Sequence, residues 1–290
     1  MLKFFQWGRI HIILLGATMA VLSLGCEKQV EKHTVDVAAW NVRVFSDKSR
    51  DAAEVKRIAD VLIGYDIAAL VELRDEQVLK RTVTQLEEMG RRYEYLISPA
   101  VGRHMTERFA FLYDPQFATV SAPGQLYDDG ADGEEDFIRD PYFATFRAGS
   151  FDFTVIVVRV VWGKVEERQR EIQSLADVYR QVQHADANEN DVILLGDFNR
   201  NPDDSRAFAR LESIPSMMNL FDLPLASHIE DTSLFDNIFF QSGHTSEYTG
   251  ECGIDKFDEK DWANNDLAAS QAVSDRRPVW ARFSMNIDDD

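Results

Sequence analysis

The chain has 290 residues, of which 50 are acidic and 31 are basic, so its formal net charge is −19 at pH 7. A surface this acidic repels long polyanions unless metal ions or a local basic patch compensate, which argues against tight, nonspecific binding to nucleic acid. The charge does not exclude a small phosphorylated substrate in a metal-filled cleft.

Residues 1–25 have the order of a bacterial secretory signal, with a positively charged start followed by an apolar run over 10–24. The end of this run, VLSLGC, resembles a lipobox, in which the cysteine is diacylated and becomes the first residue of the mature protein. We therefore expect lipidation at Cys26 and a lipid-anchored protein of the bacterial cell envelope, periplasmic or on the outer surface. The alternatives are an ordinary signal peptide and a retained membrane helix, but the apolar run is short for a span of about 20 residues.

The cysteine count and the length limit how many disulfides and domains the mature protein can have. Removal of residues 1–25 takes away two basic and no acidic residues, so 29 basic residues face 50 acidic ones and the net charge becomes −21. If Cys26 is lipidated, only Cys252 is left and no intrachain disulfide can form. The remaining 265 residues suit one large domain with its own core, and we expect a monomer. After the signal we expect a tether at 26–35, a domain at 36–284 and an acidic tail at 285–290.

Strands and helices alternate in the first part of the domain. The run DVAAWNVRVF at 36–45 is typical of a strand, and Asn41 lies inside it. Apolar residues three and four apart predict a helix over 53–64 with one buried face. The apolar run DIAALVEL at 66–73 has the length of a strand, with Glu72 near its end. A second helix is expected over about 75–89, and short strands are expected at 93–98, 108–113, 142–147 and 151–161.

The second part contains the clearest helix, over 166–184, and then the run DVILLGDFN at 191–199, a buried strand that leads into a polar loop. Another strand begins at Asp236. Near the C-terminus, Pro278 fits the start of a strand better than its middle, so we expect a short strand after it and Asp275 on the loop before it. No internal repeat or linker divides the domain. Strands mixed with helices predict a layered α/β protein in which one sheet packs on another.

Polar side chains stand at the ends of these predicted strands. Each is embedded in an apolar run or follows one, where an unpaired carboxylate would be costly. Taken singly, each is best interpreted as a strand-end cap or a turn former. Together at one edge of a sheet, they would make a hard oxygen-ligand site that suits Mg²⁺ or Mn²⁺. They are Asn41, Glu72, Asp197, Asn199, Asp236, Asn237 and Asp275.

In chain order the sequence presents the motifs WNVRVF, LVELRD, ERFAFLY, RDP, ILLGDFN, LFDNIFF and SDRRPVW. With these motifs it resembles the endonuclease/exonuclease/phosphatase superfamily, which contains the pancreatic-type deoxyribonucleases, from about residue 36 to 283. The pieces LLGDFN and SDxRPVW are the most specific, and the correct order argues against chance agreement. The resemblance implies a four-layer α/β/β/α sandwich, two packed mixed sheets flanked by helices, with a metal-dependent phosphoester cleft at one edge of the sheets.

The resemblance also implies roles for individual residues and a divalent cofactor, Mg²⁺ or Mn²⁺, that acts as a Lewis acid and lowers the pKa of bound water. Val71 stands where many relatives have a glutamine, which weakens hydrogen bonding around the site without removing a ligand. By motif, Asn41, Glu72 and Asp275 would be the metal ligands, and Asp197 and Asn199 would orient water or a second ion. Tyr113 and Arg139 would contact phosphate. Asp236 would position a catalytic histidine.

The chain departs from the family pattern at both catalytic histidines. The last motif is normally Ser-Asp-His-Arg-Pro, so Arg276 stands at one histidine position, while Arg159 stands at the other, late in the strand before a Trp-Gly turn. Arginine cannot transfer protons near neutral pH because its pKa exceeds about 12. It can hold phosphate through two hydrogen bonds and neutralise charge in a transition state. The alternative is that both arginines form ion pairs with Asp236 and its neighbours and only maintain the fold.

Two functions are therefore open. The first is a divalent-metal-dependent phosphoester hydrolase, nuclease- or phosphodiesterase-like, whose rate is reduced because a well-placed acid–base group is worth roughly 10²–10⁴-fold. The second is a pseudoenzyme that binds a phosphorylated ligand without turnover. None of the six histidines lies in a motif. His104 and His244 lie on predicted loops within reach of the cleft, but surface positions are expected for both.

Overall fold

The computed structural model describes residues 32–103, 106–133, 135–185, 189–263 and 265–288. The predicted signal, the lipidation site Cys26 and most of the tether lie outside the described residues. Lys32–Asp290 form one compact unit. Within the described ranges, the helices are too short or too polar to cross a membrane.

The strands form two mixed sheets of six strands each, in the orders β11-β12-β1-β2-β4-β3 and β5-β6-β7-β8-β10-β9. In each sheet one neighbouring pair is parallel, β1 with β2 and β7 with β8, and the other pairs are antiparallel. The first sheet consists of β1 (Thr34–Phe45), β2 (Ile67–Leu73), β3 (Glu94–Ile97), β4 (Arg108–Tyr113), β11 (Tyr248–Ile254) and β12 (Val279–Ser284). The second consists of β5 (Thr119–Leu126), β6 (Tyr142–Ala148), β7 (Phe151–Arg159), β8 (Val192–Asp197), β9 (Met217–Asn219) and β10 (Asp236–Gln241).

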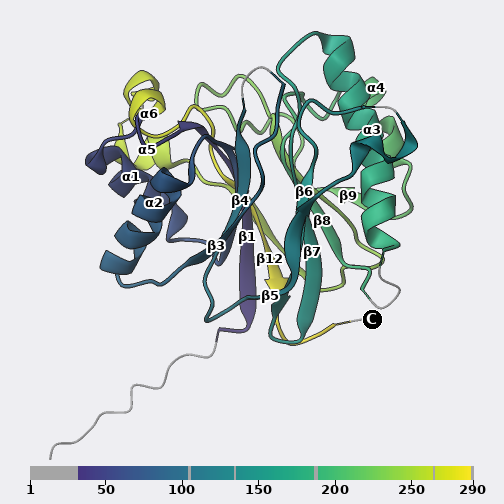
Figure 1. Cartoon of the computed structure of the whole chain (residues 1–290), viewed down its shortest axis with the longest axis horizontal. Coiled ribbons are helices and arrows are strands. Elements are labelled where there is room, and N and C mark those ends of the chain that lie inside the picture. Colours follow the sequence, from purple (N-terminus) through teal and green to yellow (C-terminus); the bar gives the residue numbers. More distant parts are fainter. Residues whose placement is uncertain (1–31, 104–105, 134, 186–188, 264, 289–290) are drawn as a thin grey trace, which may run out of the picture. The chain divides into compact units, whose positions relative to one another are not determined.

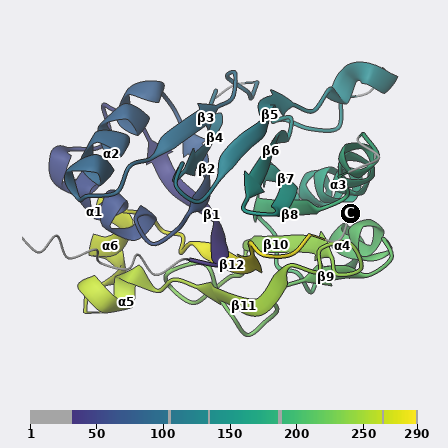
Figure 2. The same cartoon turned by 90° about the horizontal axis from the view of Figure 1, so that it is seen from below.

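Helices cover the outer face of each sheet (Figure 1, Figure 2). The helices against the first sheet are α1 (Ala52–Leu62), α2 (Glu76–Glu88), α5 (Phe257–Asp261) and α6 (Asp266–Ala272). The helices against the second sheet are α3 (Val165–Gln183) and α4 (Ser205–Glu212). A short 3₁₀ helix, Asp129–Asp132, lies between β5 and β6. The predicted four-layer α/β/β/α sandwich is therefore confirmed.

An aromatic core joins the two sheets. Phe111 of the first sheet stacks on Tyr142 of the second with ring centroids 5.4 Å apart, and Phe146 contacts Phe111 edge-on at 5.5 Å. Separate apolar cores lie between each sheet and its helices. Both faces of the central strands are thus buried, which explains why runs such as ILLGD in β8 are continuously apolar rather than alternating.

Local sequence explains where α1 begins. The carboxylate of Asp51 accepts a hydrogen bond from the backbone N–H of Glu54 at 2.8 Å, and the carboxylate of Glu54 accepts one from the backbone N–H of Asp51 at 2.9 Å. This capping box satisfies two N–H groups that have no partner inside the helix. Val55 and Ile58 then lie on the buried face, as the helical spacing predicted.

Strand direction brings the predicted site residues to one edge of the sandwich. Because β1 and β2 are parallel, Asn41 and Glu72 both lie toward the C-terminal ends of their strands. The parallel pair β7 and β8 ends at Arg159 and Asp197, which pair with each other in register. β10 runs antiparallel to β8 and begins at this edge, so Asp236 pairs with Asp197.

The loop before β12 is tied to the same edge through β1. The indole Nε1 of Trp40 donates a hydrogen bond to the carbonyl of Arg276 at 2.7 Å. The hydroxyl of Ser274 donates one to the carbonyl of Asn41 at 2.6 Å. Both bonds are buried, so the loop that carries Asp275 is held in place next to the end of β1.

The sequence patterns missed β5, β9, β11, α4, α5 and α6, and most of these elements are short or irregular. β9 has three residues, α5 has five and α6 has seven, which is too few for a periodic signal. β5 lies at a sheet edge, contains Pro123 and Gly124, and shifts register against β6 twice. Elsewhere the predicted strand over 151–161 ends earlier, at Arg159.

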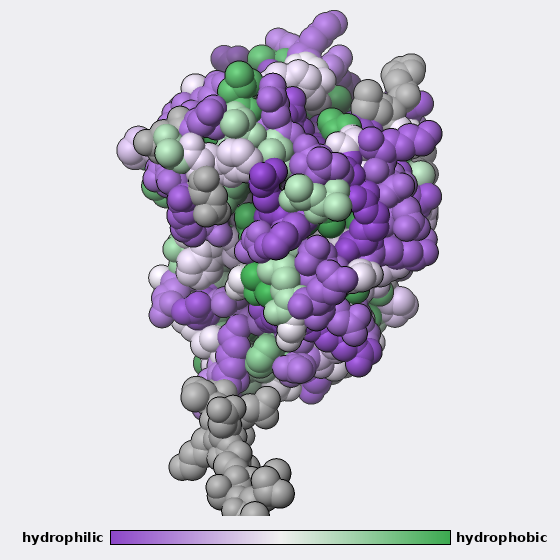
Figure 3. All heavy atoms as spheres, turned by 90° about the vertical axis from the view of Figure 1, so that its left-hand side faces the viewer, coloured by the Kyte–Doolittle hydropathy of each residue, from purple (hydrophilic) through white to green (hydrophobic). Residues whose placement is uncertain are grey.

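The outer surface over the first helical layer is mostly hydrophilic. Figure 3 shows the side of the molecule that carries α1, α2, α5 and α6, with apolar residues scattered among polar ones. Large apolar side chains that are exposed among the described residues are few, and they do not come from one element. They are Val44, Trp162, Leu223, Leu225, Leu267 and Ile287.

Candidate active site

A cleft of about 430 Å³ opens at the edge where the predicted site residues meet. Part of its wall comes from the segment 228–235 and from Trp162, whose side chain is largely exposed at the rim. Asn41, Asp197 and Asp236 lie behind the wall and are almost completely buried. The predicted site residues that line the cleft are Glu72, Arg159, Asn199, Asp275 and Arg276.

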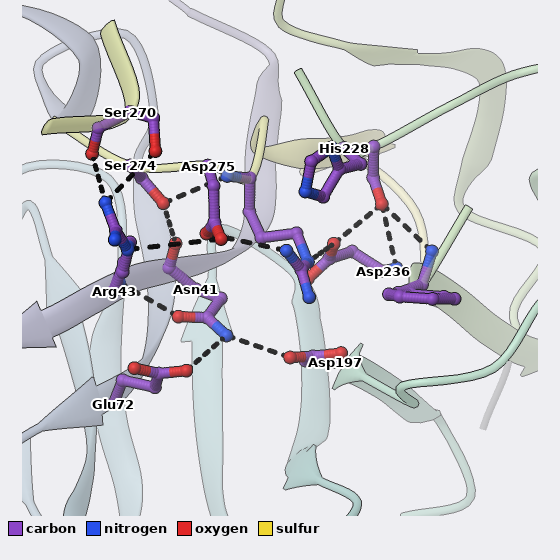
Figure 4. Close-up of polar contacts among 12 residues, drawn as sticks. Asn41, Arg43, Glu72, Asp197, His228, Asp236, Ser270, Ser274 and Asp275 are labelled. Atoms are coloured by element: carbon purple, nitrogen blue, oxygen red, sulfur yellow. Dashed lines mark hydrogen bonds and ion pairs between the residues drawn. The ribbon is translucent and has the colours of Figure 1, made fainter. Parts of the chain in front are cut away.

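Asn41 connects the two sheets at this edge. Its Nδ2 donates hydrogen bonds to Oε1 of Glu72 at 3.0 Å and to Oδ2 of Asp197 at 2.8 Å, and Figure 4 shows the amide between the two carboxylates. Its Oδ1 accepts a hydrogen bond from the backbone N–H of Arg43 at 2.9 Å. One side chain thus fixes carboxylates from β2 and from β8 relative to each other.

Glu72 is held as a carboxylate despite its burial. Burial alone would raise its pKa, but the Arg159 guanidinium and the hydrogen bonds from the backbone of Val44 and the side chain of Asn41 outweigh that effect. Together they lower the pKa of Glu72 to about 2. The group is therefore charged across the whole physiological range.

Arg159 bridges two acidic side chains. Its Nη2 lies 2.6 Å from Oε1 of Glu72, and its Nη1 lies 2.8 Å from Oε1 of Glu107. Arg139 also contacts Glu107, which is almost completely buried. Burial, and then the neighbouring charge of Arg159, lower the pKa of Arg139 to about 10. Arg139 therefore lies beside the site, behind Arg159, as part of a buried network of arginines and carboxylates.

The second predicted arginine, Arg276, pairs with the carboxylates on the other side of the cleft. Its Nε lies 3.6 Å from Oδ2 of Asp236, and its Nη1 lies 3.4 Å from Oδ1 of Asp275. Asp236 is fully buried and accepts a hydrogen bond from the hydroxyl of Ser227 at 2.7 Å. Burial, and then the adjacent charge of Asp197, raise the pKa of Asp236 well above its ordinary value.

Backbone strain gathers at this edge. Asn199 has φ of +50°, and its Nδ2 donates a hydrogen bond to the carbonyl of Val160 at 2.6 Å. Glu72 has φ of +63°, while Arg43 and Val44 have φ of +47° and +48°. Positive φ costs a non-glycine residue roughly 1–3 kcal/mol and persists only where the surroundings impose it, most often at functional sites. The strain marks this edge independently of the motifs.

Tyr113 is not brought to the cleft, and the prediction that it contacts phosphate there is wrong. It pairs with Ile67 at the start of β2, whereas Glu72 lies five residues further along the strand, roughly 16 Å away at about 3.3 Å per residue. Its ring packs in the core between the sheets, and its hydroxyl bonds to Glu94. The side chain that β4 directs toward the site comes from just before its start, at Glu107.

Sequence reasoning also missed Glu107, Ser227, His228 and Trp162. Glu107 directly precedes a predicted strand, and its acidic side chain there gave a usable signal. Ser227 and His228 lie on a segment with no periodic pattern. Burial, and then the charge of Arg276, lower the pKa of His228, which lines the cleft. His244, for which a surface position was expected, does not line the cleft, and His104 lies outside the described residues.

Arg277, next to Arg276, points away from the cleft. Its guanidinium makes two hydrogen bonds to the buried carboxylate of Asp258, at 2.7 and 2.6 Å, and also contacts Asp231. It donates a further hydrogen bond to the carbonyl of Ile229 at 3.1 Å. The two adjacent arginines therefore have different partners: Arg276 belongs to the cleft and Arg277 holds the fold behind it.

The residues at the cleft fit a divalent ion in their chemistry. Glu72 and Asp275 line the cleft and are hard oxygen donors of the kind that Mg²⁺ and Mn²⁺ prefer. The third predicted ligand, Asn41, directs its Nδ2 to Glu72 and its Oδ1 to the backbone N–H of Arg43. Oε2 of Glu72 accepts a hydrogen bond from Val44, which leaves one lone pair on that atom. In the described part of the chain, the carboxylate of Asp275 has ion pairs at 3.4 and 4.0 Å and no shorter polar contact, so its lone pairs also remain open.

Another acidic cluster lies away from the cleft. Ligand oxygens of Asp191, Glu247 and Asp288 come within 4.8 Å of one another. Asp191 directly precedes β8, whereas Asp197 is its last residue, so the cluster is at the opposite end of that strand from the cleft. It is separate from the metal site predicted by the motifs.

Comparison with known proteins identifies the family of the chain. Residues 38–272 match the model of the Endonuclease/Exonuclease/phosphatase family. Deoxyribonuclease-1 of Canis lupus familiaris is 33% identical over 170 residues, which cover 56% of this chain and 59% of that protein. Deoxyribonuclease-1 of Bos taurus is 31% identical over 193 residues, which cover 64% of this chain and 65% of that protein. The chain thus aligns with less than two thirds of the length of these relatives.

The fold agrees with solved structures of the same type. The crystal structure of D. rerio TDP2 humanized by 14 mutations superposes with a TM-score of 0.60 and 14% sequence identity, covering 87% of this chain and 99% of that one. At this identity the likeness shows the fold alone. The family is generally dependent on divalent metal ions. The family model covers most of the chain, the motifs stand in order and the sandwich is shared, so the chain belongs to the endonuclease/exonuclease/phosphatase family.

Proposed function

We propose that this chain is a phosphoesterase of the nuclease/phosphatase type that depends on a divalent ion and works slowly at the bacterial cell envelope. The observation that supports it is the meeting of Glu72, Asp275 and Asn199 with Arg159 and Arg276 in one cleft of a family member. Carboxylates and an amide provide oxygen ligands, and the arginines provide donors for phosphoryl oxygens. The strained backbone at the same edge agrees with a functional role.

Different side chains of the cleft would bind a phosphoester and orient it. Arg276 lines the cleft and keeps a distance of 3.4 Å or more from its carboxylates, so its N–H groups can turn toward a phosphoryl oxygen. Asn199 is fixed by its bond to Val160 and stands at the wall of the cleft. A divalent ion held by Glu72 and Asp275 would act as a Lewis acid and lower the pKa of bound water.

The expected rate is low because no group in the predicted histidine positions can transfer a proton. Arginine stays charged at neutral pH. Burial alone would lower the pKa of Arg276, but the charges of Asp197 and Asp236 outweigh that effect and raise it above its ordinary value. General acid–base catalysis contributes roughly 10²–10⁴-fold when a suitable group is present. The chain therefore relies on positioning and charge stabilisation.

A small phosphoester is a better substrate for this chain than a long nucleic acid. The net charge of −19 repels polyanions, and the cleft has a volume of only about 430 Å³. Trp162 at the rim gives an apolar surface beside the polar floor, next to the ring of Phe235 at 6.2 Å. These features favour a compact substrate with one phosphate and one apolar group.

One observation favours a second function, the capture of a phosphorylated ligand without turnover. Arg159 is already paired with Glu72 and Glu107, and Arg276 with Asp236 and Asp275, so each of these carboxylates has a cationic partner without a cofactor. A pseudoenzyme that only binds its ligand needs no more than such an arrangement.

Hydrolysis of small aryl phosphodiesters and of DNA, measured with Mg²⁺ or Mn²⁺, tests the proposal. We expect turnover of the small substrate that a chelator stops and that falls at least tenfold in Glu72→Ala, because a charged ligand is lost. Glu212→Ala, on the exposed surface of α4, is the matched control and keeps wild-type turnover. Binding of inorganic phosphate without turnover would support the second function, and neither binding nor turnover would refute both.

Location is proposed from the N-terminal sequence. We expect the protein to fractionate with membranes, and Cys26→Ser to release it, because one lipidated cysteine carries the anchor. Fractionation of cells that express each form measures this. If the Cys26→Ser protein stays in the membrane fraction, the apolar segment itself is the anchor and lipidation is not required.

A further inference from the structure

Glu72, the central acidic residue of the cleft, already has a cation bound to it within the chain. Nη2 of Arg159 lies 2.6 Å from its Oε1. The side chains of Glu72 and Arg159 are 12% and 11% exposed, so solvent screens this contact poorly. The pair is therefore strong enough to influence what else binds to Glu72.

Arg159 also has a second partner that keeps it in place. Its Nη1 lies 2.8 Å from Oε1 of Glu107, whose side chain is 1% exposed. One planar guanidinium thus spans two carboxylates, a geometry that suits arginine and not lysine. Because Glu107 remains as an anchor, Arg159 can release Glu72 and still be paired.

The lone pairs of Glu72 are largely in use while Arg159 is bound. Oε1 accepts hydrogen bonds from both Arg159 and Asn41, and Oε2 accepts one from the backbone of Val44. The guanidinium of Arg159 lies 2.6 Å from Oε1 of Glu72, so a second cation on the same carboxylate would lie close to its positive charge. Like charges so close in a poorly solvated site repel strongly.

We propose that Arg159 is a resident counter-ion of Glu72 that competes with the divalent ion for this carboxylate. The cleft is then complete without metal, and an ion binds only when Arg159 withdraws toward Glu107. This inference rests on the proposed function, since it concerns the metal of the same site. It also gives a second reason for a low rate, because only the fraction of molecules with Arg159 withdrawn holds the ion.

Calorimetric titration of the full chain with Mg²⁺ and with Mn²⁺ tests the competition. We expect weak binding to the wild type and binding at least tenfold tighter to Arg159→Gln, which removes the charge but keeps a hydrogen-bond donor. Arg210→Gln is the matched control: Arg210 pairs with Asp177 on the exposed helical surface, and its loss of charge is the same. Thermal unfolding provides a readout other than activity, because Mg²⁺ should raise the midpoint of Arg159→Gln and leave that of the wild type nearly unchanged.

Each further outcome supports or refutes the competition between Arg159 and the divalent ion for Glu72. If Arg159→Gln folds only when Mg²⁺ is present, the ion has taken over the role of the guanidinium and the proposal is supported. Arg159→Lys, which keeps the charge, should bind the ion less tightly than Arg159→Gln. Equal affinity of the wild type and Arg159→Gln overturns the competition. If the wild type then still hydrolyses phosphoesters with Mg²⁺, only this inference fails and the proposed function survives.

Discussion

Replacing both Arg159 and Arg276 by histidine is expected to raise phosphodiesterase activity by roughly 10²-fold or more, the lower end of what one acid–base group supplies. Imidazole titrates near neutral pH, so it can accept a proton from water and return one to a leaving group, which arginine cannot do. The metal-ligand residues of the cleft stay unchanged in this variant. The measurement is the initial rate of hydrolysis of a small phosphodiester with Mg²⁺.

A carboxylate lies next to each of the two guanidiniums that the imidazoles replace. Glu107 lies 2.8 Å from the guanidinium of Arg159, and Asp236 lies 3.6 Å from that of Arg276. Oδ1 of Asp236 is buried and makes no hydrogen bond in the described part of the chain, so it can accept one from a ring N–H. A carboxylate partner fixes the tautomer and orientation of a histidine, which is what a general base requires.

The single replacements separate the contributions. Each is expected to give much less than the double variant, since residues that act as a unit are strongly non-additive. Arg210→His, on the helical surface, controls for the change of charge alone. A fall in activity below the wild type would show that the arginines stabilise the transition state themselves. No activity in any form would favour the binding function.

Loss of Arg277, the second arginine of the SDRRPVW motif, should lower the stability of the fold. We expect Arg277→Ala to lower the free energy of unfolding by roughly 3 kcal/mol or more, because it leaves the buried carboxylate of Asp258 without a partner. The side chains of Arg277 and Asp258 are each 1% exposed, and they share two hydrogen bonds. Denaturant unfolding, followed by circular dichroism, measures the change.

Two comparisons make that expectation sharp. Arg210→Ala removes an exposed pair and should cost no more than about 1 kcal/mol. Arg277→Met combined with Asp258→Leu removes both buried charges and should recover much of the lost stability. If Arg277→Ala unfolds like the wild type, water reaches Asp258 and the pair is not a structural anchor.

The layers of the fold could be predicted because they follow from local patterns. Buried strands such as β8 are continuous apolar runs, and α1 carries both a capping box and a periodic apolar face. The short helices α5 and α6 could not be predicted, since five and seven residues make less than two turns and hold no helical period, and β9 has only three residues. Edge strand β5 was missed because Pro123 and Gly124 are typical of turns.

The site could be predicted only in part, because motifs name residues while contacts depend on the assembled sheets. Asn41, Glu72 and Asp197 stand at strand ends, so their meeting followed from strand direction. The partner of Arg159 could not be found in the same way, since Glu107 is 52 residues distant and bonds to it only after β4 and β7 have entered different sheets. The motif does not place Tyr113 correctly because β4 runs antiparallel to β2, so Tyr113 lies at the end of β4 that is away from the cleft.

The irregular edge strands bear on aggregation at high protein concentration. An open sheet edge offers unpaired N–H and C=O groups on which strands of another copy can assemble. Here β3 and β9 have only four and three residues, and β11 shifts register against β12. β5 lacks an N–H at Pro123 and shifts register twice. All four edge strands are thus poor templates for a strand of another copy. Their short or irregular backbones therefore hinder edge-to-edge polymerisation.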